Sequence, residues 1–164
     1  MRIYHGTEEY ASEGHRSDVA LGYFDGVHEG HRAVIRLCTA FDSGAVKAVL
    51  TFTESPAAAL GRPTPPALTD NEEKARLLEA LGVEVLILED FSAIRRLSAD
   101  EFVGRILRDR LRARSVTCGY NYRFGKGGEG DCARLSSLCA QEGIAVKVAA
   151  PVFVMASFTR TIES

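Results

Sequence analysis

The sequence predicts an α/β fold: a Rossmann-like, open and mainly parallel sheet of five strands, with helices on both faces. Short apolar runs alternate along the chain with amphipathic stretches. The runs are continuously apolar, which is typical of strands buried on both faces, and helices between such strands are typical of parallel crossover units. A length of 164 residues suits one domain. We therefore expect residues 1–164 to form a single domain.

The N-terminal half supplies two strong strands and one helix. Residues 19–24 form an apolar run that ends in turn chemistry, and Val46–Phe52 is a second, valine-rich run. Between them, residues 30–41 carry apolar side chains at helical spacing. Residues 2–4 are a candidate for a short edge strand.

Two further helices have clear start or stop signals. Residues 72–81 place leucines on one face, and Gly82 is a stop signal. Ser98 with Glu101 three residues later forms a capping box for a helix to about Arg112. The other expected elements are strands at residues 83–88, 115–119 and 144–150, and a helix at residues 132–142.

Composition excludes several classes of protein. The net charge of −2 is not that of a broad nucleic-acid surface, so no nucleic-acid partner is expected. No apolar run approaches the ~20 residues of a membrane span, and the N-terminus lacks the features of a secretory signal. The four cysteines are scattered without a CxxC pair, so we expect neither disulfides nor a zinc site, and a cytoplasmic location.

Ligands of parallel α/β sheets bind where loops leave the carboxyl ends of the strands. The informative loops should therefore follow residues 24, 52, 119 and 150. The segment 53–69 is long for an α/β connection and contains four prolines. Long loops of this kind are often functional lids, and an exposed linker is the alternative.

The first of these loops contains the main chemical feature. His28 and His31 stand three residues apart at the start of a helix, so both imidazoles lie on one face of its first turn. A helix N-terminus favours anions through its dipole and its free N–H donors. Gly26 and Gly30 remove side chains that would keep a phosphate from the backbone. Two imidazoles there can stabilise a phosphate that gains charge as a bond breaks.

Two other interpretations of the histidine pair stay open at this point. The pair could bind a metal, although catalytic zinc usually has three protein ligands and no third is evident nearby. Alternatively, His31 is packed in the core and His28 is solvated. The segment matches neither the GxxxxGK[ST] phosphate loop nor the GxGxxG dinucleotide motif.

Residues 22–31, GYFDGVHEGH, resemble the GxFDGVHxGH signature of the HxGH nucleotidyltransferases. Within that superfamily, the chain resembles the FMN adenylyltransferase (FAD synthetase) module of bacterial bifunctional riboflavin kinase/FAD synthetases, over almost its whole length. The module's other motifs are matched at Thr51-Phe52 with Pro56, Leu68-Thr69, Glu73-Lys74, Leu77-Leu78, Gly82-Val83, Phe102, Leu107, GYNYRFG at residues 119–125, and Glu129-Gly130-Asp131.

The resemblance implies adenylyl transfer from ATP to FMN, giving FAD and pyrophosphate. It implies ATP and FMN as small-molecule partners, Mg²⁺ entering with ATP, and no covalent enzyme intermediate. We expect no metal site made by the protein and no riboflavin kinase domain within these 164 residues. The oligomeric state is left open.

The resemblance also assigns roles to individual residues. His28 and His31, with Arg160, would act on the ATP phosphates. The other nucleotide contacts would be Gly22, Tyr23, Phe24, Asp25, Gly26, Gly30, Gly119, Ser157 and Thr159. The flavin contacts would be Thr51, Phe52, Pro56, Asn121, Arg123 and Phe124.

The chain departs from the family pattern near its end. The late motif SSTxIR is matched by residues 157–162, but Phe158 replaces the second serine and Ile162 stands where the arginine is expected. Arg160 is the nearest guanidinium that could replace it. Tyr23, Ser55 and Gly128 also replace frequent family residues. Two alternatives therefore remain: another HxGH transferase with a different phosphorylated acceptor, and a module that binds nucleotide or flavin without turnover.

Overall fold

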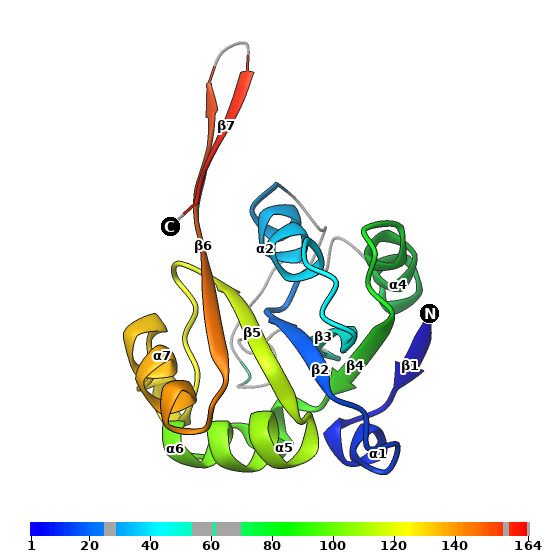
Figure 1. Ribbon diagram of the computed structural model, residues 1–164, viewed down its shortest axis with the longest axis vertical. Helices are drawn as coiled ribbons and strands as arrows, with labels where there is room; N and C mark the ends of the chain where they lie inside the picture. The colour runs from blue at the N-terminus through cyan, green and yellow to red at the C-terminus, as the bar shows by residue number, and fades with distance from the viewer. Residues whose placement is uncertain (25–28, 54–60, 62–69, 156–157, 164) are drawn as a thin grey trace.

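The computed structural model describes residues 1–24, 29–53, 61, 70–155 and 158–163. Within these residues, one sheet of seven strands has helices on both faces, and Figure 1 shows that β7 and the end of β6 project beyond these helices. The strand order is β1-β4-β3-β2-β5-β6-β7, parallel throughout except for β7, which pairs antiparallel with β6. The strands are β1 (Arg2–Tyr4), β2 (Ser17–Leu21), β3 (Val46–Phe52), β4 (Val85–Glu89), β5 (Ala113–Gly119), β6 (Ala145–Met155) and β7 (Phe158–Glu163).

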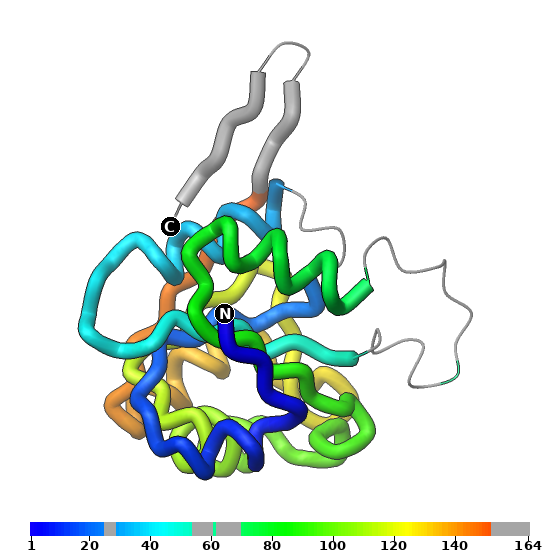
Figure 2. Tube along the Cα trace, turned by 90° about the vertical axis from the view of Figure 1, so that its right-hand side faces the viewer, coloured from blue at the N-terminus to red at the C-terminus, as the bar shows by residue number. Residues whose placement is uncertain are grey.

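The helices that connect these strands include the four expected ones and three short ones that were not expected. They are α1 (Thr7–Ala11), α2 (Glu29–Thr39), α4 (Asn71–Ala80), α5 (Phe91–Ile94), α6 (Ala99–Glu101), η2 (Phe102–Arg110), the short η3 (Lys126–Gly128) and α7 (Cys132–Gln141). In the side view of Figure 2, α4 (green) and the N-terminal segment (blue) face the viewer. No helix in the described part of the chain combines the length and the apolar character needed to cross a bilayer.

The predicted fold class is confirmed, with more strands than the five expected. Strand β1 is the short edge strand that the sequence suggests at residues 2–4, and β7 is an antiparallel strand that was not predicted. Strand β6 continues to Met155, beyond the predicted end at residue 150. Strand β2 stops at Leu21, short of the predicted end at residue 24, and Phe24 takes a left-handed backbone conformation (φ 58°) that does not belong to a strand.

Side chains that alternate along the strands pack into two separate hydrophobic cores, one on each face of the sheet. Val19 and Leu21 of β2 pack against α1, η2 and α7, whereas Ala20 faces α2 and α4. Figure 1 shows the same division, with α2 and α4 on one side of the sheet and the remaining labelled helices on the other. Burial on both faces explains why the strands are continuously apolar in sequence.

The helix signals act as the sequence predicts. Asp70 caps α4 by accepting a hydrogen bond from the Glu73 N–H (2.7 Å), and Gly82 (φ 97°) follows its end. The capping box joins Ser98 and Glu101 reciprocally, at 3.1 Å in each direction. This helix then widens into i→i+5 hydrogen bonding in η2.

A buried ion-pair network lies at the amino end of β2. Asp18 is fully buried and accepts hydrogen bonds from Lys47 (2.7 Å), Ser115 (2.5 Å), Arg114 (3.0 Å) and Ser43. Burial acts most strongly on its pKa and raises it, but the hydrogen bonds from Lys47, Ser115 and Ser43 together lower the pKa of Asp18 to about 2. Asp18 therefore stays ionised in the folded protein at neutral pH.

Strand β2 lies at the centre of the sheet, where the chain stops adding strands on one side and begins to add them on the other. This strand pairs with β3 on one side and β5 on the other, as the partners Ala20–Val49 and Ala20–Thr117 show. Later strands are added outward from both, so the β2–β5 boundary is the topological switch point of the sheet. The connections after β2 and β5 lead to helices on opposite faces of the sheet, α2 and α7, and so leave a crevice for a ligand between them.

Candidate functional site

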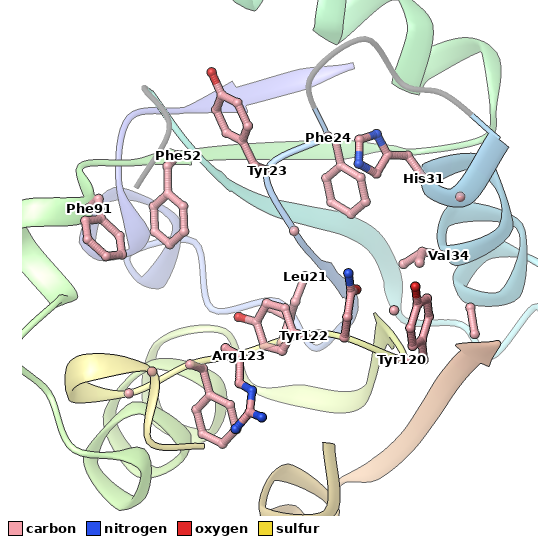
Figure 3. A pocket seen from close by; sticks show the side chains of 18 of the residues that line it. Leu21, Tyr23, Phe24, His31, Val34, Phe52, Phe91, Tyr120, Tyr122 and Arg123 are labelled. Atoms are coloured by element: carbon pink, nitrogen blue, oxygen red, sulfur yellow. The ribbon is translucent and has the colours of Figure 1, made fainter. Parts of the chain in front are cut away.

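A cavity of about 920 Å³ opens at the switch point (Figure 3). Its size falls within the range of small-molecule sites. It is lined by residues at or after the carboxyl ends of β2, β3, β4 and β5, by residues of α2 and η2, and by one stretch of β6, and the sequence predicts a site at these strand ends. The lining residues are Leu21, Gly22, Tyr23, Phe24, Glu29, Gly30, His31, Val34, Phe52, Phe91, Ile94, Arg95, Phe102, Gly119, Tyr120, Asn121, Tyr122, Arg123, Phe124, Gly125, Gly128, Ala149, Ala150 and Pro151.

The turn at residues 22–24 forms one wall. Phe24 is buried in its left-handed conformation, and its ring folds back over Gly22. The carbonyl of Tyr23 accepts hydrogen bonds from the Thr51 hydroxyl (2.6 Å) and the Lys74 ammonium group (2.8 Å). Two donors from different elements therefore hold this turn against β3 and α4.

The N-terminal turn of α2 brings His31 to the cavity. Glu29, Gly30 and His31 of this turn line it, and His31 is half-buried. The imidazole packs edge-to-face on Phe24, with ring centroids 5.3 Å apart and planes at 82° (Figure 3). The structure thus combines two of the open interpretations, since His31 is packed against the core and also faces the cavity. The helix N-terminus adds a positive potential at the same place.

Aromatic side chains form the opposite part of the cavity. Phe52 packs edge-to-face on Phe91 with centroids 5.1 Å apart, and Figure 3 shows the two rings side by side. Tyr122 stacks on Phe124 at 6.1 Å and 11°, and burial raises the pKa of the Tyr122 phenol above its ordinary value. The phenol therefore remains a neutral hydroxyl, and this side of the cavity suits a flat aromatic ligand.

The loop after β5 is shaped by two glycines. Gly130 pairs with Phe124 through two backbone hydrogen bonds (3.2 and 2.8 Å), and a Cβ on Gly130 would lie 2.5 Å from the Phe124 ring. Gly125 has φ 79°, a conformation that favours glycine. These requirements explain the spacing of GYNYRFG and the later Glu129-Gly130-Asp131. They present Asn121 and Arg123 to the cavity.

The structure brings most of the predicted site residues together. Ten of them line the one cavity: Gly22, Tyr23, Phe24, Gly30, His31, Phe52, Gly119, Asn121, Arg123 and Phe124. Thr51 is fully buried, and its hydroxyl donates a hydrogen bond to the Tyr23 carbonyl, which holds the turn at residues 22–24. Thr159 and Arg160 belong to β7, where they pair with Val154 and Phe153. The remaining predicted residues lie outside the described part of the chain: Asp25, Gly26, His28, Pro56 and Ser157.

Several residues in or beside the cavity were not predicted as site residues, among them three from one short helix and a buried lysine. Phe91, Ile94 and Arg95 come from α5 and its end, a four-residue helix too short to give a periodic signal. Lys74 lies on the buried face of α4 with Ala75 and is only 1% exposed. The sequence identified Lys74 only as part of the Glu73-Lys74 motif match, without a role, and its place beside Ala75 and Leu78 on the buried helix face was the signal for one.

Charges in the lining are few. Among the lining residues that the structure describes, Arg95 and Arg123 are cationic and Glu29 is the one carboxylate. In the described part of the chain, no group of three or more His, Cys, Asp or Glu side chains could hold a metal ion.

Comparison with known proteins gives consistent matches. A family model described as FAD synthetase matches residues 11–159. The bifunctional riboflavin kinase/FMN adenylyltransferase of Bacillus subtilis is 35% identical over 135 residues, which is 79% of this chain and 42% of that protein. The protein of the same description from Listeria monocytogenes is 38% identical over 123 residues, which is 72% of this chain and 39% of the relative.

A solved structure extends the match to three dimensions. A protein described as a macrolide-efflux protein from Streptococcus pneumoniae superposes with a TM-score of 0.76 at 29% identity. The superposition covers 91% of this chain and 49% of that chain. This chain accordingly spans less than half the length of the two curated relatives and of this structural neighbour.

Proposed function

The chain belongs to the FAD synthetase family, and from that premise we propose that it transfers the adenylyl group of ATP to FMN. The products are FAD and pyrophosphate. One observation carries the proposal: the histidine-bearing turn of α2 and the aromatic loop after β5 face each other across one cavity at the switch point. A phosphate subsite and a flat aromatic subsite are thereby adjacent.

The reaction needs positioning more than covalent chemistry. An oxygen of the FMN phosphate attacks the α-phosphorus of ATP, and a new P–O bond forms. The bond from the α-phosphorus to the bridging oxygen breaks, and the electron pair leaves with pyrophosphate. No side chain forms a bond to phosphorus, so the protein contributes orientation and electrostatic stabilisation.

His31 and the N-terminus of α2 supply that stabilisation in our proposal. The imidazole lines the cavity beside N–H groups of the first helical turn. Hydrogen bonds from these donors strengthen as negative charge gathers on the departing pyrophosphate. The residues that would complete the nucleotide subsite are His28, Asp25, Gly26, Gly30, Gly119, Ser157, Thr159 and Arg160.

The flavin subsite is assigned to the aromatic side of the cavity. Phe52 and Phe91 form an edge-to-face pair there, and Tyr122 and Phe124 form a second, stacked pair. Asn121 and Arg123 line the same region and would donate hydrogen bonds to the polar edge of the isoalloxazine ring. Pro56 would lie over the flavin, and Thr51 is assigned to support of the turn.

Magnesium and cellular location complete the proposal. Mg²⁺ would enter as MgATP, where it neutralises phosphate charge, with Glu29 as the available carboxylate of the described lining. A reducing, cytoplasmic location remains the prediction drawn from the four scattered cysteines.

The proposal is tested by incubating the protein with ATP, Mg²⁺ and FMN, and following FAD and pyrophosphate by chromatography. His31→Gln is expected to lower kcat by about 100- to 1,000-fold, because it removes an imidazole from the phosphate subsite. His15→Gln is the matched control, since that side chain is exposed and outside the cavity lining. Equal loss of activity in both variants, or no FAD from the unaltered chain, would contradict the proposal.

A second candidate is a module that binds flavin without turnover. It is favoured by Phe158 and Ile162, which replace a polar residue and a guanidinium in the family's late motif. In that case, FMN quenching titrations would show binding while the chromatogram shows no FAD. Ile162→Arg would then restore measurable turnover if the missing guanidinium is the cause.

A further inference from the structure

We propose that Lys74 is a positioning residue for the site: together with Thr51, it holds the Tyr23 carbonyl and thereby sets the places of Phe24 and His31. The inference rests on the proposed adenylyl transfer for its kinetic consequence. Neither Lys74 nor Thr51 lines the cavity, so both act through the turn at residues 22–24.

The environment of Lys74 is that of a lysine with a specific task. Its side chain is almost fully buried, although lysine is rarely buried unless its ammonium group is paired. The ammonium group donates to the Tyr23 carbonyl at 2.8 Å and lies 4.2 Å from the centroid of the Tyr23 ring. One residue of the turn is therefore contacted by Lys74 through both its main chain and its side chain.

Thr51 reaches the same carbonyl from another direction. Its hydroxyl, at the end of β3, donates to the Tyr23 oxygen at 2.6 Å, whereas Lys74 donates from α4. A carbonyl oxygen has two lone pairs, and each is used here by a different element. The two donors thus hold the peptide between Tyr23 and Phe24 in one orientation.

That peptide orientation matters because Phe24 is strained. A bulky residue with positive φ is uncommon, and such a conformation persists only when its surroundings impose it. The two hydrogen bonds to the preceding carbonyl are part of those surroundings. If they are lost, we expect the turn to relax toward negative φ, which moves the Phe24 ring away from Gly22.

The position of His31 depends on that of the Phe24 ring. The imidazole packs edge-to-face against that ring, with the two ring centroids 5.3 Å apart. If the ring moves, the imidazole loses a packing contact that holds it in place. A small displacement of a phosphate-binding group is costly to the rate, because the reacting groups must be held near the attack geometry. Lys74 and Thr51 consequently influence kcat without touching a substrate.

The first test is kinetic. Lys74→Met and Thr51→Val are each expected to lower kcat by about 10- to 100-fold, while the KM values for ATP and FMN stay within about threefold. Thr51→Ser keeps the hydroxyl and is expected to retain most of the wild-type kcat. Equal losses in Thr51→Val and Thr51→Ser would overturn the proposal, because the hydrogen bond would then be irrelevant.

The second test does not depend on turnover. The ring current of Phe24 shifts the NMR signal of the His31 imidazole protons, which are assigned by their disappearance in His31→Gln. In Lys74→Met and Thr51→Val this signal is expected to move toward its position in Phe24→Leu. An unmoved His31 signal in both variants would overturn the proposal.

A matched control separates local from general effects. Lys147→Met removes the same charge and also breaks a lysine bond to a main-chain carbonyl, that of Leu37 at 3.5 Å. It is expected to leave kcat and the His31 signal unchanged, and an equal shift there would contradict a specific role for Lys74. If the unaltered chain forms no FAD, the proposed function fails, but the His31 signal still decides whether Lys74 positions the site.

Discussion

A Cβ atom built on Gly22 would lie 2.8 Å from Cζ of Phe24 and 3.1 Å from both of its Cε atoms. Real Cβ atoms essentially never approach a carbon so closely, and the Phe24 ring is buried, so it has little room to yield. The glycine that begins the GYFDGVHEGH motif is thus required by the packing of a ring two residues later. That ring in turn supports His31.

Gly22→Ala is therefore expected to destabilise the fold by about 1–3 kcal/mol, because the added methyl group overpacks a filled site. It should also lower kcat, because the displaced Phe24 ring no longer supports His31. Urea unfolding and FAD formation measure the two effects.

Gly104→Ala supplies the control for that substitution. A Cβ there would meet nothing nearer than the Arg108 guanidinium at 3.7 Å, an ordinary contact. Since alanine is a better helix former than glycine, this variant is expected to gain up to about 1 kcal/mol. A loss of stability as large as that of Gly22→Ala would mean that the contact with Phe24 is not the cause.

Stability is expected to fall in acid because of Asp18. Its pKa in the folded protein is about 2, below the ordinary value of 3.8, so ionised Asp18 favours the folded state. The contribution is fully present above about pH 4 and is lost as the pH falls toward 2. The shift corresponds to about 2 kcal/mol. Urea unfolding at several pH values between 2 and 5 measures this dependence.

Asp18→Asn checks the assignment. The variant leaves Lys47 buried without its carboxylate partner, so it is expected to lose about 3–5 kcal/mol at neutral pH. Its stability should then change less than that of the wild type between pH 4 and pH 2. An unaltered acid dependence in Asp18→Asn would assign the effect to other carboxyl groups.

One cysteine is expected to react before the others. Burial raises the pKa of Cys38 and Cys139 to about 11 and that of Cys118 well above its ordinary value, so these thiols form little thiolate at pH 8. Cys132 is half-buried and lies at the carbonyls of Gly119 and Tyr120 (3.3 and 3.4 Å). Titration with a coloured disulfide reagent should show one fast thiol.

Cys132→Ser identifies that thiol. The fast phase should disappear in this variant and persist in Cys139→Ser. Because Cys132 contacts the backbone of the loop that lines the cavity, bound FMN is expected to slow the reaction. A fast phase that survives Cys132→Ser would show that a buried thiol is more accessible than the structure indicates.

Local signals allowed much of the fold to be predicted. The capping box at Ser98 and Glu101 and the glycine stop at position 82 depend on neighbours within a few residues, and both occur as expected. The short helix α5 and the strand β7 were not predicted, since four residues give no helical period and β7 depends on pairing with β6. The left-handed conformation of Phe24, beyond the early end of β2, was not predicted either, since a bulky residue does not favour it.

The sequence alone determined the fold class, the family motifs and the identity of most cavity residues, because apolar periodicity and residue spacing are properties of the chain itself. Only the tertiary structure decided which of them act together. The place of the cavity depends on strand order, which brings the ends of β2 and β5 side by side. The roles of Thr51 and Lys74 depend on a carbonyl that is 28 residues from one and 51 from the other. Such contacts arise from packing between elements, and no local pattern encodes them.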